Sequence, residues 1–118
     1  MKWLQWEEGR RSTGYYKMLI FRAYWFTTPF DLYLLKYPTG SSVPPHTDTV
    51  SGYRHYRINV VMKKASIGGD FKSDYCIVNL SRLKIFRSDF KHEVTLIEKG
   101  IRYVLSFGVC LKIKGEML

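Results

Sequence analysis

Residues 83–113 read LKIFRSDFKHEVTLIEKGIRYVLSFGVCLKI, and this stretch decides the fold class. It contains three runs rich in branched and aromatic residues, Leu83–Arg87, His92–Ile97 and Arg102–Ile113, a composition typical of strands. Short polar segments such as Glu98-Lys99-Gly100 separate the runs, as tight turns do. The stretch therefore predicts a series of short strands.

The rest of the chain continues this pattern. Further strand candidates are Asp31–Tyr37, Tyr53–Met62 and Asp70–Leu80, whereas residues 15–26 read either as a strand or as a short N-terminal helix. Short strands that recur with turn signals every eight to twelve residues or so are typical of sandwiches and barrels. The sequence thus predicts an all-β or mainly β fold.

Length and composition predict one globular domain over residues 1–118. Hydrophobic residues make up 46% of the 118 residues and charged residues 25%, which excludes a disordered or fibrous chain. We expect residues 1–30 to form a cover or lid over this domain. No run of apolar residues is long enough to span a membrane, and residues 1–11 lack an apolar signal core, so a cytoplasmic location is expected.

The chain is strongly basic, with 19 Lys and Arg against 10 Asp and Glu and a net charge of +9. This charge suits an anionic partner such as nucleic acid or a small dicarboxylate, and it equally suits a soluble basic protein that binds no nucleic acid. Cys76 and Cys110 lie in apolar runs, which predicts buried thiols in a reducing compartment.

The histidines provide one candidate metal site. His46 and Asp48 are two residues apart, so they point the same way from an extended chain, and His92 follows 44 residues later at the start of a strand. Two histidines and one carboxylate form the facial triad that binds Fe(II) and leaves coordination positions open. The alternative is that Asp48 caps a turn and His92 is a surface residue. His55 reads as a structural or substrate-side residue.

Arg102 follows His92 by ten residues, and the intervening sequence suits a three-residue hairpin loop. In that register Leu96 faces Arg102, and both share a face with His92, about 13 Å from Arg102 along the strand. A guanidinium reaching back could bind a carboxylate with two hydrogen bonds while the other end of the ligand meets the metal. The alternative is a surface arginine.

Over residues 31–108 the sequence resembles the Fe(II)- and 2-oxoglutarate-dependent dioxygenases, and it is most similar to their prolyl-hydroxylase-type branch. The order and spacing of the short motifs carry this resemblance. They are Leu35–Gly40, His46-Thr-Asp48, Gly68-Gly69-Asp70-Phe71, Leu83–Arg87, His92-Glu-Val and Gly100–Ser106.

The resemblance implies a double-stranded β-helix, or jelly-roll, in which His46, Asp48 and His92 bind Fe(II). It also implies that Arg102 pairs with the distal carboxylate of the cosubstrate 2-oxoglutarate and that Tyr37 lines the cosubstrate pocket. One departure concerns a second tyrosine of many relatives, whose position falls near Met62. The alternatives for its role are Asn59, Tyr56 or Arg102 acting alone.

By this resemblance the protein is expected to be an oxidoreductase. It would use O2 and 2-oxoglutarate to hydroxylate or oxidatively demethylate a substrate, with a peptidyl residue as the first expectation and a nucleic-acid base as the second. Two other classes stay open. The jelly-roll could be a binding module without turnover, or the chain could be a basic nucleic-acid-binding β-domain whose binding depends on salt and not on iron.

Overall fold

A computed structural model describes residues 4–9, 14–25, 28–49 and 52–112. These residues form twelve strands and no helix, which confirms the all-β prediction. The strands are β1 (Trp6–Glu8), β2 (Tyr16–Trp25), β3 (Thr28–Tyr37), β4 (Val43–His46), β5 (Tyr53–Lys63), β6 (Ile67–Gly68), β7 (Phe71–Ser73), β8 (Cys76–Asn79), β9 (Leu83–Arg87), β10 (His92–Val94), β11 (Ile97–Lys99) and β12 (Arg102–Lys112).

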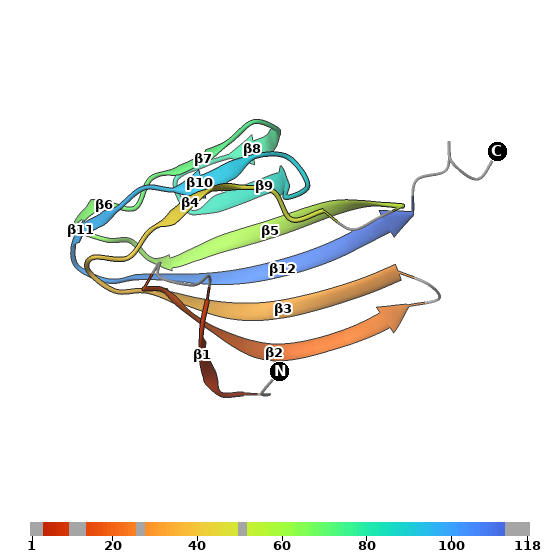
Figure 1. Cartoon of the computed structure of the whole chain (residues 1–118), viewed down its shortest axis with the longest axis horizontal. Helices are drawn as coiled ribbons and strands as arrows, with labels where there is room; N and C mark the ends of the chain where they lie inside the picture. The colour runs from red at the N-terminus through yellow and green to blue at the C-terminus, as the bar shows by residue number, and fades with distance from the viewer. Residues whose placement is uncertain (1–3, 10–13, 26–27, 50–51, 113–118) are drawn as a thin grey trace.

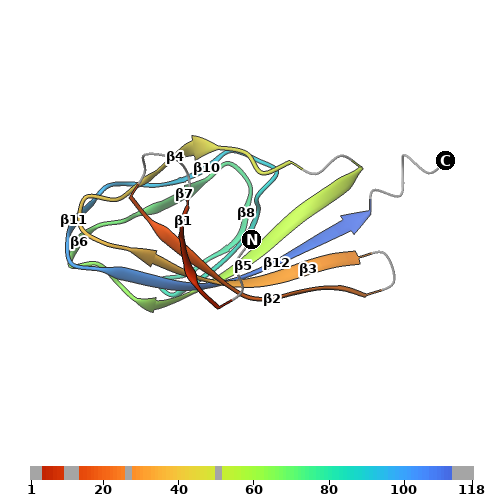
Figure 2. The same ribbon diagram turned by 60° about the horizontal axis from the view of Figure 1, so that its bottom comes forward.

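The strands form two layers, which Figure 1 shows along their length and Figure 2 from a second direction. The major sheet has seven strands in the order β1-β2-β3-β12-β5-β9-β8, and the second layer contains a three-stranded sheet, β4-β10-β7. A two-stranded sheet, β11-β6, completes the fold. Two packed β layers are the architecture of a jelly-roll.

The strand alternative is correct for residues 16–25, and a short helix there is not found. This segment pairs with β3 from Tyr16↔Lys36 to Trp25↔Thr28, with one irregularity between Leu19 and Phe21. Aromatic and branched residues fit the pleated surface of a sheet better than a helix, which explains the choice.

The hydrophobic core lies between the two layers. Its buried members come from both layers and are Tyr37, Val43, Val61, Val94, Ile97 and Val104. Along β12 burial alternates, and Arg102, Val104 and Ser106 all face this interior. The inward face of the major sheet therefore carries polar as well as apolar side chains, and these polar side chains surround the candidate site.

The predicted hairpin between His92 and Arg102 is wrong. β10 ends at Val94, β11 pairs with β6, and β12 pairs with β3 and β5 instead of with the preceding strands. Leu96 is 51% exposed whereas Arg102 is 4% exposed, so they do not share a face. Gly100, with φ of 91°, lets the chain leave one sheet and enter the other, where a hairpin would have folded it back.

Cys76 and Cys110 are both free; Cys110 is buried and Cys76 is half-buried. Among the described residues no helix could cross a membrane. The run Asp70–Leu80 is divided into β7 and β8, which belong to different sheets.

Candidate metal centre

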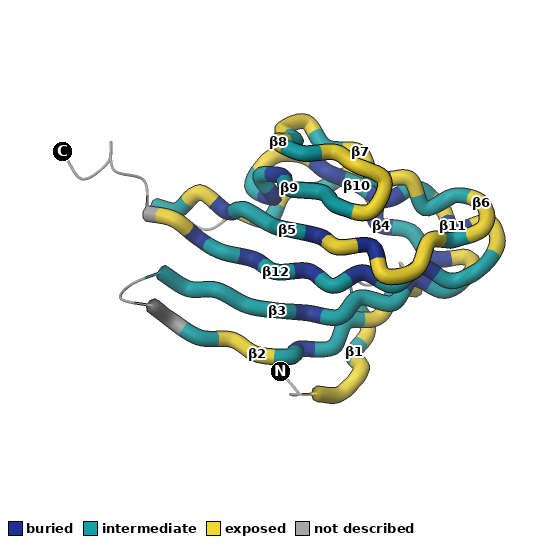
Figure 3. Tube along the Cα trace, turned by 180° about the vertical axis from the view of Figure 1, so that it is seen from behind, coloured by how far each residue is buried: buried dark blue, intermediate teal, exposed yellow. Residues whose placement is uncertain are grey.

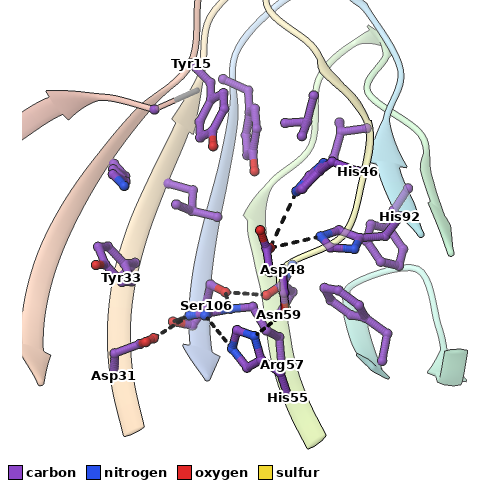
Figure 4. Close-up of a pocket in the computed structure, with 18 residues that line it drawn as sticks. Tyr15, Asp31, Tyr33, His46, Asp48, His55, Arg57, Asn59, His92 and Ser106 are labelled. Carbon is purple, nitrogen blue, oxygen red and sulfur yellow. Dashed lines mark hydrogen bonds and ion pairs between the residues drawn. The ribbon is translucent and has the colours of Figure 1, made fainter. Parts of the chain in front are cut away.

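Two neighbouring strands of the second layer bring the candidate ligands together. His46 is the last residue of β4 and His92 the first of β10, and the antiparallel pairing of these strands sets the two histidines directly opposite each other. Pro44 and Pro45 favour the extended backbone before His46, since their φ angles are fixed. Asp48 follows two residues later, and Figure 4 shows its carboxylate pointing towards both imidazoles.

The three side chains converge on one point. The ligand atoms of His46, Asp48 and His92 all lie within 4.8 Å of one another. Asp48 Oδ2 is 3.5 Å from His46 Nε2 and 3.4 Å from His92 Nε2. Among the residues that the structure describes, this is the one group of three or more His, Cys, Asp or Glu with such an arrangement.

The backbone fixes which imidazole nitrogen faces the centre. His46 Nδ1 lies 2.8 Å from the Pro44 carbonyl oxygen, and His92 Nδ1 lies 2.9 Å from that of Phe90. Because a carbonyl oxygen only accepts, each Nδ1 donates a proton, and in a neutral ring Nε2 then carries a lone pair. Metal-binding histidines are oriented by hydrogen bonds of this kind.

Three lone-pair groups therefore face one another, and a proton or a cation between them is needed to offset their repulsion. Burial raises the pKa of Asp48, but when each Nε2 carries a proton, hydrogen bonds and charge interactions with His46 and His92 outweigh this effect and hold the pKa well below its usual range. Asp48 is therefore ionised near neutral pH. Two imidazoles and one carboxylate suit Fe(II) and related divalent ions.

A second set of residues holds the backbone of Asp48 by hydrogen bonds. The Asp48 N–H donates to the Ser88 carbonyl at 2.7 Å, and His55 Nδ1 donates to the Asp48 carbonyl at 3.1 Å. Burial lowers the pKa of His55, so its imidazole is neutral near pH 7 and its Nε2 can accept a hydrogen bond. Arg57 Nη1 lies 3.4 Å from that nitrogen. His55 is thus no part of the converging group; it supports the Asp48 backbone and also lines the cavity at that group.

Arg57 extends this support across three strands. Its Nε donates to Ser106 Oγ at 2.7 Å and its Nη2 to Asp31 at 2.6 Å, so it links β5 through β12 to β3. Ser106 Oγ in turn donates to Asn59 Oδ1 at 2.6 Å. A Cβ on Gly108 would lie 2.4 Å from Arg57 Nη1, so the guanidinium needs glycine at this position.

The sequence alone assigned no role in this site to Arg57, Asp31 or Ser106. The available signal was the spacing of His55, Arg57 and Asn59, three polar residues two apart within a strand, which places them on one face. These three residues face the interior because β5 pairs with β12, and the local sequence does not specify this pairing.

Tyr37 and Arg102 lie opposite each other on β3 and β12. The Arg102 guanidinium is 5.0 Å from the centre of the Tyr37 ring, and its buried Nη1 has no hydrogen-bond partner. Burial raises the pKa of Tyr37 to about 12, so the phenol is neutral. Burial also lowers the pKa of Arg102, partly offset by Tyr37.

Two separate cavities lie in this part of the fold. The cavity of about 440 Å³ at the converging group is lined by Tyr37, and a second cavity of about 380 Å³ is lined by Arg102; Phe71 lines both. Of the residues considered for the missing tyrosine, Asn59 lines the first cavity. Met62 is 59% exposed, and Tyr56 lies against Arg87.

The likeness to solved structures identifies the fold. One chain of the Rhodobacter sphaeroides SigE complex with the anti-sigma ChrR has a TM-score of 0.53 and 17% identity over 88% of this chain. KdgF from Halomonas sp. has a TM-score of 0.54 and 14% identity over 97% of this chain. The chain has a cupin-type jelly-roll fold.

This cupin-type chain spans 47% of the length of the first of these structures and 91% of the second. No protein-family model matches its sequence, and no curated protein does. At such low identity the likeness establishes the fold alone, so the function has to be argued from the side chains in the cavity.

Proposed function

We propose that this protein is an Fe(II)- and 2-oxoglutarate-dependent oxygenase that hydroxylates or oxidatively demethylates its substrate. The observation that carries the proposal is the convergence of His46, Asp48 and His92, with both Nδ1 atoms held by backbone carbonyls and both Nε2 atoms directed at the carboxylate. The fold is compatible with such a metal site.

The converging group fits Fe(II) by the chemistry of its donors. His46, Asp48 and His92 would hold the ion and leave coordination positions open on the cavity side. When bound there, iron and 2-oxoglutarate together supply the oxygen-activating chemistry. Asp48 is ionised, and the supporting bond from His55 holds its backbone while a ligand binds.

The buried Arg102 fits the far carboxylate of 2-oxoglutarate. A guanidinium that is 4% exposed and has an unpartnered Nη1 favours an acceptor beside it, because a buried donor without a hydrogen bond is costly. A carboxylate would meet this need with charge-assisted hydrogen bonds. Tyr37 lines the cavity beside it and would position the cosubstrate.

Other residues of the cavity provide its shape. Apolar side chains of Val43, Phe71 and Val94 line it near the converging group. Lys17 and Tyr33 bring polar groups to the same cavity. We propose a peptidyl residue as the substrate, with a nucleic-acid base as the second candidate because of the net charge of +9.

The test is an anaerobic titration of the apo-protein with Fe(II) and 2-oxoglutarate, following the visible charge-transfer absorption of a 2-oxo acid bound to ferrous iron. We expect a band that requires both components and is lost in His92→Ala. Glu93→Gln is the matched control, because Glu93 is next in sequence but points to the other side of β10. A folded wild-type protein without the band would overturn the proposal.

A second candidate is a jelly-roll module that binds a metal but has no turnover. The observation that favours it is the likeness to a chain of the SigE complex with the anti-sigma ChrR, a complex between two proteins. This candidate predicts that Fe(II) binds to the converging group whereas 2-oxoglutarate has no effect on the spectrum. Succinate production with any substrate would exclude it.

A further inference from the structure

The outward face of the major sheet carries an apolar surface that the described residues leave uncovered. The strand pairing aligns two rows of side chains across β2, β3, β12, β5 and β9. One row is Phe21, Leu32, Phe107, Ile58 and Ile85, and the other is Met18, Leu34, Leu105, Val60 and Leu83. We call these ten residues the outer ladder.

The outer ladder lies opposite the metal cavity. Residues on one strand alternate between faces, so Phe107 points outward while its neighbours Ser106 and Gly108 point inward to Asn59 and Arg57. Aromatic rings extend the face, because Phe30 is 5.8 Å from Phe21 and 6.1 Å from Phe107 between ring centres.

No element of the described chain covers the outer ladder. Seven of the twelve strands belong to the major sheet itself, and the other five form the two smaller sheets. The three-stranded sheet packs on the inward face, where Val43 and Val94 meet Val61 and Val104 (Figure 2). Figure 3 shows β9, β5, β12, β3 and β2 side by side, with buried residues recurring along β12 and mostly half-buried or exposed residues along β9, β3 and β2.

The size of the face matches an interface. Eight paired residues of β3 and β12 at about 3.4 Å each, and five strands at about 4.8 Å, give roughly 650 Å² for the whole outward face before side-chain relief is counted. The outer ladder makes up about half of this area, at its centre. Stable interfaces bury about 600–1,000 Å² per partner, so the whole face has the size of an interface. Phe21 and Val60 are 39% and 38% exposed.

We propose that the outer ladder is a homodimer interface in which the major sheets of two copies pack face to face. The ten side chains carry no charge, so a two-fold axis near β12 sets apolar residues against apolar residues from either copy. Two such faces pack at about 10 Å with strands inclined by about 30°, as in a sandwich. The metal cavities then open on the two outer sides of the dimer.

The net charge of +9 sets the salt dependence of this dimer. Two copies repel each other at low ionic strength, and salt screens this repulsion while leaving apolar contact intact. Dimerisation therefore strengthens as salt is added. Binding to an acidic partner would show the opposite dependence, which distinguishes the two.

The experiment is sedimentation equilibrium of the full chain from micromolar to submillimolar concentration, at low and high salt. We expect a reversible monomer–dimer equilibrium that shifts to dimer with salt. Val60→Lys and Phe107→Lys place a charge in the ladder and should weaken dimerisation at least about tenfold. Leu96→Lys is the matched control, because Leu96 is 51% exposed and lies outside the major sheet.

A wild-type protein that is monomeric at every concentration, or that forms aggregates without a discrete dimer, would overturn the proposal. So would a dimer that Val60→Lys leaves unchanged. Circular dichroism and Fe(II) binding show whether each variant is folded. If Phe107→Lys fails to fold, Val60→Lys decides, since its side chain already contacts solvent.

Discussion

At the scale of single residues, Arg57 supports the candidate metal centre although it is not one of the three ligands. It donates to Ser106 and Asp31, and through His55 it reaches the backbone of Asp48. Its side chain is 14% exposed, so a partner left alone after its removal is poorly hydrated. A change at Arg57 should therefore alter the position of a ligand that it does not touch.

We predict that Arg57→Met lowers the affinity of the protein for Fe(II) by about 10–100-fold, the usual effect of removing a supporting hydrogen bond around a metal. Calorimetric titration with Mn(II), an oxidation-resistant substitute, measures this. Arg54→Met is the control, because Arg54 is exposed and points to the other face of β5. Equal affinities in the two variants would show that Asp48 does not need this support.

Asp89 contributes to the dependence of folding stability on acidic pH. Burial raises its pKa, but hydrogen bonds and the charge of Arg87 outweigh this and hold the pKa below its usual range. Arg87 is also held by three aromatic rings, with Phe90 nearest at 4.8 Å. The ion pair is thus a fixed contact beside the β9–β10 turn.

Because the pKa of Asp89 is lower in the folded chain than in the unfolded one, its contribution is complete above about pH 4 and is lost as the pH falls further. We predict that Asp89→Asn lowers the free energy of unfolding at pH 7 by about 1 kcal/mol. The difference from wild type should shrink below pH 4, as measured by urea unfolding. A difference that stays constant down to pH 2 or so would contradict the assignment.

At the scale of elements, the long strands were predictable, whereas the breaks within Asp70–Leu80 and His92–Ile97 and the partners of the strands were not. Branched and aromatic residues predicted β12, and the His46-Thr-Asp48 spacing predicted two side chains on one side of a strand end. The His92–Arg102 hairpin failed because Gly100 passes the chain between sheets. The local sequence predicts the backbone conformation of a residue but not which strand pairs with it.

The support of Asp31 for Arg57 shows the same limit. These residues are 26 apart in sequence and lie on β3 and β5, which are separated in the sheet by β12. Nothing in either strand alone specifies the pair. The strand order brings them together, and Gly108 on the strand between leaves space for the guanidinium.

The Arg57 guanidinium occupies the space that a side chain at position 108 would need. In Gly108→Ala the new Cβ would lie 2.4 Å from Arg57 Nη1, so the guanidinium has to move. We predict a loss of about 1–3 kcal/mol in the free energy of unfolding. In an Arg57→Ala background the same change should cost much less, and a double-mutant cycle measures this coupling. Additive losses would show that the guanidinium does not rest on Gly108.

At the scale of the whole molecule, charge opposes folding and packing supports it. The net charge of +9 is spread over 118 residues, and the compact state brings these charges closer than the unfolded chain does. Ion pairs such as Arg57–Asp31 and Arg87–Asp89 neutralise few of the 19 basic residues. Repulsion among the rest acts through solvent and is open to screening.

We therefore predict that sodium chloride raises the free energy of unfolding measured with urea, mostly below about 0.15 M, where the screening length shortens to about 8 Å. If repulsion among basic residues dominates, the free energy of unfolding rises with salt. If surface ion pairs dominate, it falls with salt. Measurement at a protein concentration below dimerisation separates this effect from association. A stability that falls with salt would show that the few paired acidic residues outweigh the basic excess.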